Sequence, residues 1–252
     1  MTTKSTNVQL SLDSLYQING TIALHVQDLL NDPLPGETDQ ARFTLFAKTD
    51  WTPDQETREA SKAFRAVMAD FVNFLDKAIF FKQCAVQPLE ISPLPKSMSA
   101  GELTVYLQGQ VDERILAIAR DQRLTNPKKL AEFEEGLDDW ARATTSGYFS
   151  LRRCLEHHFQ RPDKDIEFLV RVPTVRAGDQ DLGPGDSVES GAMITLLPTV
   201  RMRIFPANQP VQLKAQDVVD AAVTLIQVIN PQIVEYVRRI RDERKPEQGG
   251  VT

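Results

Sequence analysis

One short segment combines residue types that could perform acid–base chemistry on a phosphate group. It reads Leu151-Arg-Arg-Cys-Leu-Glu-His-His-Phe159 and holds two of the three histidines in the chain. In a helix, the step of 100° per residue places Arg153 and His157 next to each other on the side away from the apolar stripe, with Arg152 and His158 on the flanks of that stripe. The segment therefore predicts a guanidinium and an imidazole side by side on a solvent-facing surface.

Such a pair suits the cleavage of RNA, because RNA carries its own nucleophile in the 2′-hydroxyl group. An imidazole, which ordinarily titrates at a pKa of about 6.5, can accept or donate a proton near neutral pH. A guanidinium keeps its charge, and its planar fork fits phosphate oxygens. The reaction needs neither a metal ion nor a cofactor. We therefore predict metal-independent cleavage to a 2′,3′-cyclic phosphate, with His157 as base or acid and Arg152 or Arg153 at the phosphate.

The spacing Arg-x-x-x-x-His on a late helix resembles the signature of the HEPN superfamily. Arg152 to His157 fits this motif, and the frame from Arg153 to His158 fits its spacing equally well. The family usually has Asn, Asp or His after the first Arg, where this chain has Arg153. Many HEPN domains are helical bundles that act as ribonucleases in toxin, abortive-infection and CRISPR-linked antiviral defence systems. The resemblance implies a cytoplasmic homodimer with a composite site, RNA as substrate, and an antitoxin or defence-system partner.

The same residues also have a purely structural interpretation. Arg152 and Glu156 are four residues apart, as are Arg153 and His157, which is the spacing of ordinary surface neighbours on a helix. In that case the helix is only a surface for a dimer or a partner, and the chain is a non-catalytic helical interaction or accessory protein of a defence or regulatory complex. Binding of a small ligand between the bundle and the sheet is a third alternative.

Other candidate sites carry weaker signals. Cys154 shares a helix with His157 and His158, but a zinc site needs a fourth ligand and no second Cys/His cluster exists, so we predict no metal site. His25 is expected at the surface or at the edge of the core. The basic run from Arg238 to Lys245 could follow an RNA backbone, or it could simply complement the dipole at a helix C-terminus.

Composition limits the class of protein. The chain has 252 residues, of which 41% are hydrophobic and 25% are charged, so it can form a globular core. A net charge of −6 gives no global attraction to nucleic acid or to an anionic membrane. The polar N-terminus lacks a secretory signal, and no stretch is apolar enough to span a bilayer. We therefore expect a single cytoplasmic domain over residues 1–252 without a membrane partner.

The elements that must position the motif can be predicted from capping and periodicity. The patterns Thr52-Pro-Asp-Gln55 and Ser99-x-x-Glu102 are capping boxes, and each starts a helix. Asn126-Pro127 is expected to cap a third helix, and the polar run Thr144 to Gly147 to break it. From these signals and the apolar periodicity we predict helices over about 15–29, 52–79, 99–118, 126–143, 148–161 and 215–244, the last kinked or split at Pro231.

A change from helical to alternating periodicity predicts strands after the motif. Residues 166–172 and 200–204 alternate apolar with charged side chains, and a shorter strand is expected at 8–12. The predicted fold class is mainly α, a HEPN-like helical bundle, with a small antiparallel β element inside a β-rich excursion at about 163–206.

Overall fold

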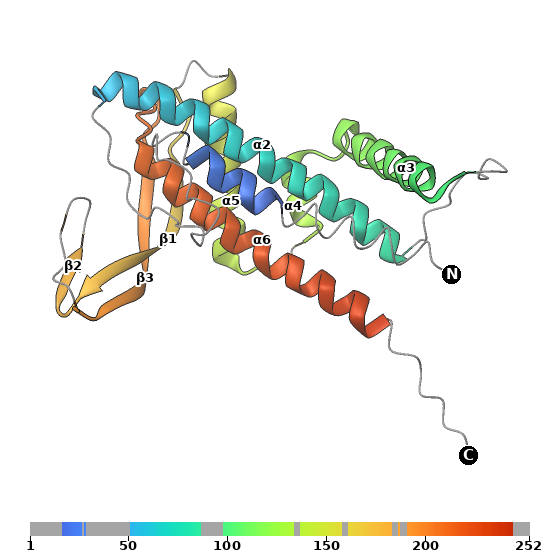
Figure 1. The fold of residues 1–252 in the computed structure, drawn as a ribbon. Coiled ribbons are helices and arrows are strands. Elements are labelled where there is room, and N and C mark those ends of the chain that lie inside the picture. Colours follow the sequence, from blue (N-terminus) through green and yellow to red (C-terminus); the bar gives the residue numbers. More distant parts are fainter. Residues whose placement is uncertain are drawn as a thin grey trace. The chain divides into compact units, whose positions relative to one another are not determined.

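The computed structural model is mostly helical with one small antiparallel sheet (Figure 1). It describes residues 17–26, 28, 51–86, 98–133, 137–157, 161–182, 186 and 191–243. The chain forms two compact units: one contains residues 71–136 and 229–252, and the other contains residues 19–70 and 137–228. The predicted fold class, mainly α with a small antiparallel β element, is therefore confirmed. The predicted strand at 8–12 lies outside the described residues.

Local capping signals locate the first two long helices. The helix α2 spans Pro53–Val86, and the Thr52 amide donates to Gln55 Oε1 at 3.1 Å while Gln55 N donates back to Thr52 Oγ1. The helix α3 spans Ala100–Arg120 behind the reciprocal Ser99–Glu102 box. The predicted apolar stripe of α2 is buried: Ala60, Phe64, Val67, Met68, Phe71, Leu75 and Ile79. Both capping boxes are confirmed, since each satisfies backbone groups that a helix start leaves unpaired.

The middle of the chain differs from the prediction. The helix α4 spans Asn126–Ala131 only, and its N-cap is Thr125 rather than Asn126. The helix α5 spans Asp139–His157 and begins where the Asp138 carboxylate accepts a hydrogen bond from the Ala141 amide at 2.7 Å. The predicted third helix over 126–143 is therefore wrong: this range contains the whole of the short helix α4 and the beginning of α5.

The predicted break at residues 144–147 is also wrong, because α5 runs through this polar run without interruption. Thr145 Oγ1 donates to the carbonyl of Ala141 in its own helix, and Thr144 Oγ1 donates to the carbonyl of Leu169. A Cβ atom on Gly147 would lie 2.6 Å from Phe168 Cδ1. The hydroxyls are thus satisfied and the glycine allows close packing, so residues that usually favour turns remain helical here.

The sheet has the strand order β2-β1-β3 and is antiparallel throughout (Figure 1). Strand β1 spans Ile166–Ala177 and pairs along its whole length with β3, Ile194–Phe205. Strand β2, Gln180–Leu182, pairs only with the last three residues of β1. Both predicted strands are confirmed and extend further than their alternating patterns indicated. The described strands all lie within the predicted excursion at 163–206.

Each unit has its own core. In the unit that contains the sheet, Tyr148 of α5 is packed between Phe64 and Phe168, with ring centroids 5.9 and 4.7 Å away. In the other unit, Lys129 and Asp76 form a buried ion pair at 2.5 Å. The final helix α6, Ala215–Glu243, runs through Pro231, so the predicted split is wrong. Residues 17–26 are helical as predicted, although Asn19-Gly20 is a turn signal.

Candidate functional site

The motif lies at the C-terminal end of α5, and its first arginine is fully engaged. Arg152 is half-buried, and its Nε donates to Glu156 Oε1 at 2.8 Å, one helical turn away. Its NH1 also donates to the backbone carbonyl of Met68 on α2 at 3.4 Å. These contacts hold Arg152 along the helix surface. The predicted surface pair between residues four apart is therefore present for Arg152 and Glu156.

Arg153 and His157 have the opposite environment. Both side chains are exposed, and that of His157 is 68% accessible to solvent. The His157 Nε2 atom lies 3.8 Å from Glu156 Oε2, so the Glu156 carboxylate stands between the Arg152 guanidinium and the imidazole. The predicted placement of Arg153 and His157 away from the core is confirmed, because it depends only on the helical period.

The opposite side of α5 explains why these two residues face outwards. Leu151, Cys154 and Leu155 are buried with Tyr148 in the core of their unit. Burial raises the pKa of the Cys154 thiol, and the nearby Asp163 carboxylate adds to this effect. Cys154 and His157 therefore point to different surroundings and do not converge on one ion. Among residues of the described ranges, no three His, Cys, Asp or Glu side chains are grouped as metal ligands.

Two features predicted from the sequence involve residues or side chains that the structure does not describe. His158, the second histidine of the motif, lies outside the described residues, and with it the alternative frame that begins at Arg153. The side chains of the basic run at 238–245 are likewise not described. The described part of the motif consequently comprises Arg152, Arg153 and His157, together with Glu156, which the spacing of the motif did not mark as a site residue.

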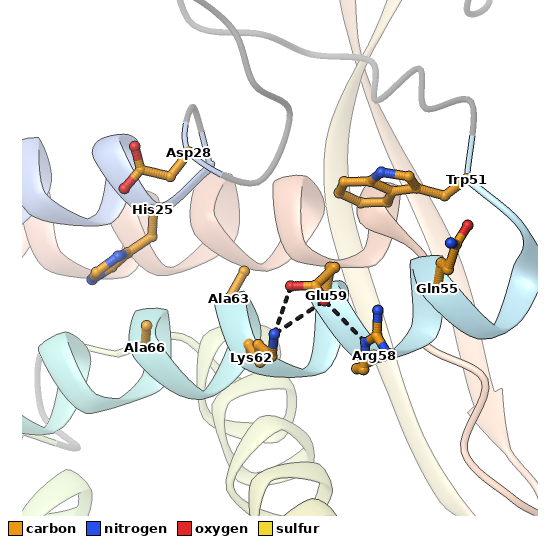
Figure 2. Close-up of a pocket in the computed structure, with 9 residues that line it drawn as sticks. All are labelled: His25, Asp28, Trp51, Gln55, Arg58, Glu59, Lys62, Ala63 and Ala66. Atoms are coloured by element: carbon orange, nitrogen blue, oxygen red, sulfur yellow. Dashed lines mark hydrogen bonds and ion pairs between the residues drawn. The ribbon is translucent and has the colours of Figure 1, made fainter.

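A separate pocket of about 540 Å³ lies beside α2, in the same unit as α5. Figure 2 shows His25 and Trp51 at opposite ends of it, with Glu59 accepting hydrogen bonds from both Arg58 and Lys62. These two bonds lower the pKa of Glu59. The volume is typical of small-molecule sites, but the two cations already share one carboxylate. None of the lining residues belongs to α5.

No motif in the sequence pointed directly to this pocket. His25 was expected at the surface or core edge, and it is half-buried with Nε2 3.0 Å from Asp70 Oδ2. Trp51, which directly precedes the Thr52 cap, also lines the pocket. The one local signal is the charge pattern of Arg58, Glu59 and Lys62 on the first turns of α2. Such a pattern is common on solvated helices, so it could not identify a pocket.

A buried polar cluster near α6 supplies the most perturbed carboxyl group described. Asp220 is largely buried, and desolvation raises its pKa from the ordinary 3.8 to about 6. Gln216 donates to its Oδ1 at 2.7 Å, and the positive charges of Arg201 and Arg203 on β3 oppose the rise. Burial also raises the pKa of Tyr148. This cluster sits under the sheet and its side chains are not part of the motif.

Comparison with known proteins supplies no relative from which a role could be transferred: no family model, no curated protein and no solved structure matches the chain. No described helix is both long and apolar enough to cross a membrane. The function must therefore be argued from the residues of this chain.

Proposed function

We propose that the chain is a metal-independent ribonuclease of the HEPN type, with its site at the exposed end of α5. One observation carries the proposal: the His157 imidazole and the Arg153 guanidinium are both open to solvent, one helical turn apart, on a helix whose other side is buried. A proton-transfer group and a fixed cation are thus accessible to a strand of RNA at the same place.

In the proposed reaction, His157 takes the proton from a ribose 2′-hydroxyl group. The 2′-oxygen attacks the adjacent phosphorus atom, the bond from phosphorus to the 5′-oxygen breaks, and the departing 5′-oxygen receives a proton. The products are a 2′,3′-cyclic phosphate and a free 5′-hydroxyl group. Arg153 contacts the phosphate oxygens as their negative charge increases. A second copy of the chain would supply a second imidazole as the acid.

Glu156 and Arg152 have positioning roles in this proposal. Arg152 is held by Glu156 at 2.8 Å and by the Met68 carbonyl, so Arg153 is the arginine free to reach a phosphate. The other carboxylate oxygen of Glu156 lies 3.8 Å from His157 Nε2. Glu156 thus links the held arginine to the catalytic imidazole on one turn of the helix.

The test is an RNA cleavage assay with the purified chain in EDTA. We expect cleavage of single-stranded RNA, no cleavage of the same sequence with 2′-deoxyribose, and a 2′,3′-cyclic phosphate on the 5′ fragment. His157→Ala should lower the rate at least 100-fold, because general acid–base catalysis contributes about 10²–10⁴. Arg153→Ala should lower it less, by about 10-fold or more, since one charge-assisted contact is worth about 1.5–3 kcal/mol.

The matched control is His25→Ala, which removes a histidine that pairs with Asp70 away from α5. It should leave the rate unchanged. Circular dichroism should give the same spectrum for all variants, because Arg153 and His157 are exposed. If His157→Ala cuts RNA as fast as the unaltered chain, His157 has no part in the reaction.

A second candidate is a non-catalytic interaction protein, and one observation favours it. Strand β3 exposes large apolar side chains, among them Leu196 and Met202. Contiguous apolar surface of this kind is typical of protein interfaces. In this case α5 is one more surface for a partner such as an antitoxin or another defence protein. The complete absence of RNA cleavage by the unaltered chain would support this candidate over the ribonuclease.

A further inference from the structure

One face of the sheet, here called the outer face, is apolar and uncovered. It is formed by the even-numbered residues of β3, all of which are apolar and exposed: Ile194, Leu196, Pro198, Val200, Met202 and Ile204. The five that are not proline are between 43 and 63% accessible to solvent. The pairing register places Leu169 of β1 opposite Met202, and Val175 opposite Leu196. The same register places Glu167 opposite Ile204 and Arg171 opposite Val200, so the apolar surface continues from β3 onto β1 only at Leu169 and Val175.

The opposite, inner face of β3 carries the polar residues of the strand. Arg203 pairs with Asp217 of α6 at 2.7 Å, and Phe205 is buried. A sheet with one face in water normally has the reverse arrangement, with polar side chains outside and apolar ones inside. On the inner face Arg203 is only half-buried beside Asp217 and Arg201 is exposed, while on the outer face five large apolar side chains are left in water, which is unfavourable for an isolated chain. The outer face thus has the composition of a surface that is covered.

The edge of the sheet indicates how it is covered. Strand β3 is an edge strand, with β1 on one side only. Pro198 lies directly opposite Pro173, and because neither has an N–H group this must be a pair without mutual hydrogen bonds. The backbone of Pro198 then points to the free edge, where it offers no donor in the middle of the strand. A strand added along this edge would be interrupted there, so packing against the face is the favoured mode.

We propose that the outer face packs against the outer face of a second copy of the chain. The exposed fractions correspond to roughly 700 Å² of apolar surface per copy, close to the ~800 Å² that each partner contributes to a standard interface. The β3 strip has no charged residue at any of its even positions. A two-fold axis near the middle of the β3 strip would place the Ile204 end of one copy over the Ile194 end of the other. Apolar side chains of the two strips would then contact each other along the whole strand.

Nucleic acid does not fit the β3 strip, since it would require several cations and the strip has none. The proposal is argued from the sheet alone and does not rest on the ribonuclease proposal, although that reaction would also use a second copy of the chain as the source of its acid. Face-to-face packing of two sheets at a spacing of about 10 Å is a common arrangement in β proteins.

The test is analytical ultracentrifugation of the full chain between about 1 and 100 μM. We expect a dimer for the unaltered chain and at least a 100-fold weaker association for the double variant Val200→Glu/Met202→Glu, which would bury two carboxylates in each copy. The matched control is Val105→Glu: Val105 is also apolar and is 74% exposed, but it lies on α3. This control should remain a dimer.

Several outcomes would overturn the proposal. A monomer at 100 μM for the unaltered chain would do so, and so would a dimer that persists in the double variant, since the interface would then lie elsewhere. Binding of the monomer to phosphatidylcholine vesicles, lost in the double variant, would identify a lipid surface as the occupant instead. If the double variant unfolds by circular dichroism, Leu196→Lys replaces it with the same expectation.

Discussion

The two faces of the β1–β3 sheet are built from the same two strands, yet their large apolar side chains differ in exposure to solvent. On the inner face Phe168 contacts the Tyr148 ring at a centroid distance of 4.7 Å and lies against Gly147 of α5. Phe168 and Phe205 are both buried there. On the outer face Met202 and Leu196 remain exposed although they are just as apolar. Apolar character alone therefore does not decide burial in this sheet.

The difference comes from what α5 and α6 offer to the inner face. Asp217 of α6 provides a carboxylate for Arg203, whose guanidinium also lies 4.6 Å from the centroid of the Phe205 ring. Trp140 and Thr144 of α5 donate to the Leu169 carbonyl of β1. Polar residues of the strand can thus be accommodated inside because specific partners are present. An alternating strand shows that two faces exist, but its partners decide which face is covered.

The largest difference in stability between the two faces is expected when one apolar side chain on each face is shortened to alanine. Phe168→Ala should lower the free energy of unfolding by about 3–5 kcal/mol, because it removes a buried aromatic side chain and leaves a cavity. Met202→Ala should change it by no more than about 0.5 kcal/mol at protein concentrations where the chain is monomeric. Urea denaturation measures both values. Equal losses for the two variants would mean that the outer face is covered within a single chain.

A second test uses pH and the polar cluster beneath the inner face. The folded-state pKa of Asp220 is about 6, above the ordinary 3.8, because burial penalises the carboxylate. Between these two values the unfolded chain releases a proton that the folded chain keeps. The contribution of Asp220 to stability is therefore greatest below pH 4 and is lost as the pH rises to about 6 and beyond.

Asp220→Asn removes this penalty while keeping a side chain that can contact Gln216. Relative to the unaltered chain, the variant should gain stability between pH 4 and pH 7, by up to about 3 kcal/mol at 1.36 kcal/mol per pKa unit. Denaturation at several pH values measures the gain. A difference between the two proteins that is the same at pH 4 and at pH 7 would contradict the raised pKa.

A smaller effect is expected at the contact between α5 and the sheet. Gly147→Ala should lower the free energy of unfolding by about 1–2 kcal/mol, because the added Cβ would overlap with Phe168 and overpacking typically costs about 1–3 kcal/mol. Gly109→Ala on α3 is the matched control, since nothing lies within 4 Å of its added Cβ. The control should stabilise the chain by up to about 1 kcal/mol through helix propensity. A stabilising Gly147→Ala would mean that the sheet moves away from α5 at little cost.

Much of the helical layout could be predicted from the sequence because its causes are local. The capping boxes at Thr52 and Ser99 involve residues three positions apart, and the stripe of α2 depends only on the helical period. The exposure of Arg153 and His157 could be predicted for the same reason. The break expected at Thr144 to Gly147 was wrong because the groups that accommodate these residues in a helix are distant in the sequence. The Leu169 carbonyl accepts a hydrogen bond from Thr144, and the Phe168 ring packs against Gly147.

Local patterns in the sequence were enough to locate most helices and strands and to predict which side of α5 faces solvent, because short-range geometry repeats along a helix or a strand. Tertiary packing was needed to show that Arg152 is held by the Met68 carbonyl, that His25 and Trp51 share a pocket, and that Arg203 and Phe205 of β3 face α6 and the core while the apolar strip faces solvent. Each of these depends on groups far apart in the chain, and their proximity is set by packing rather than by any local preference.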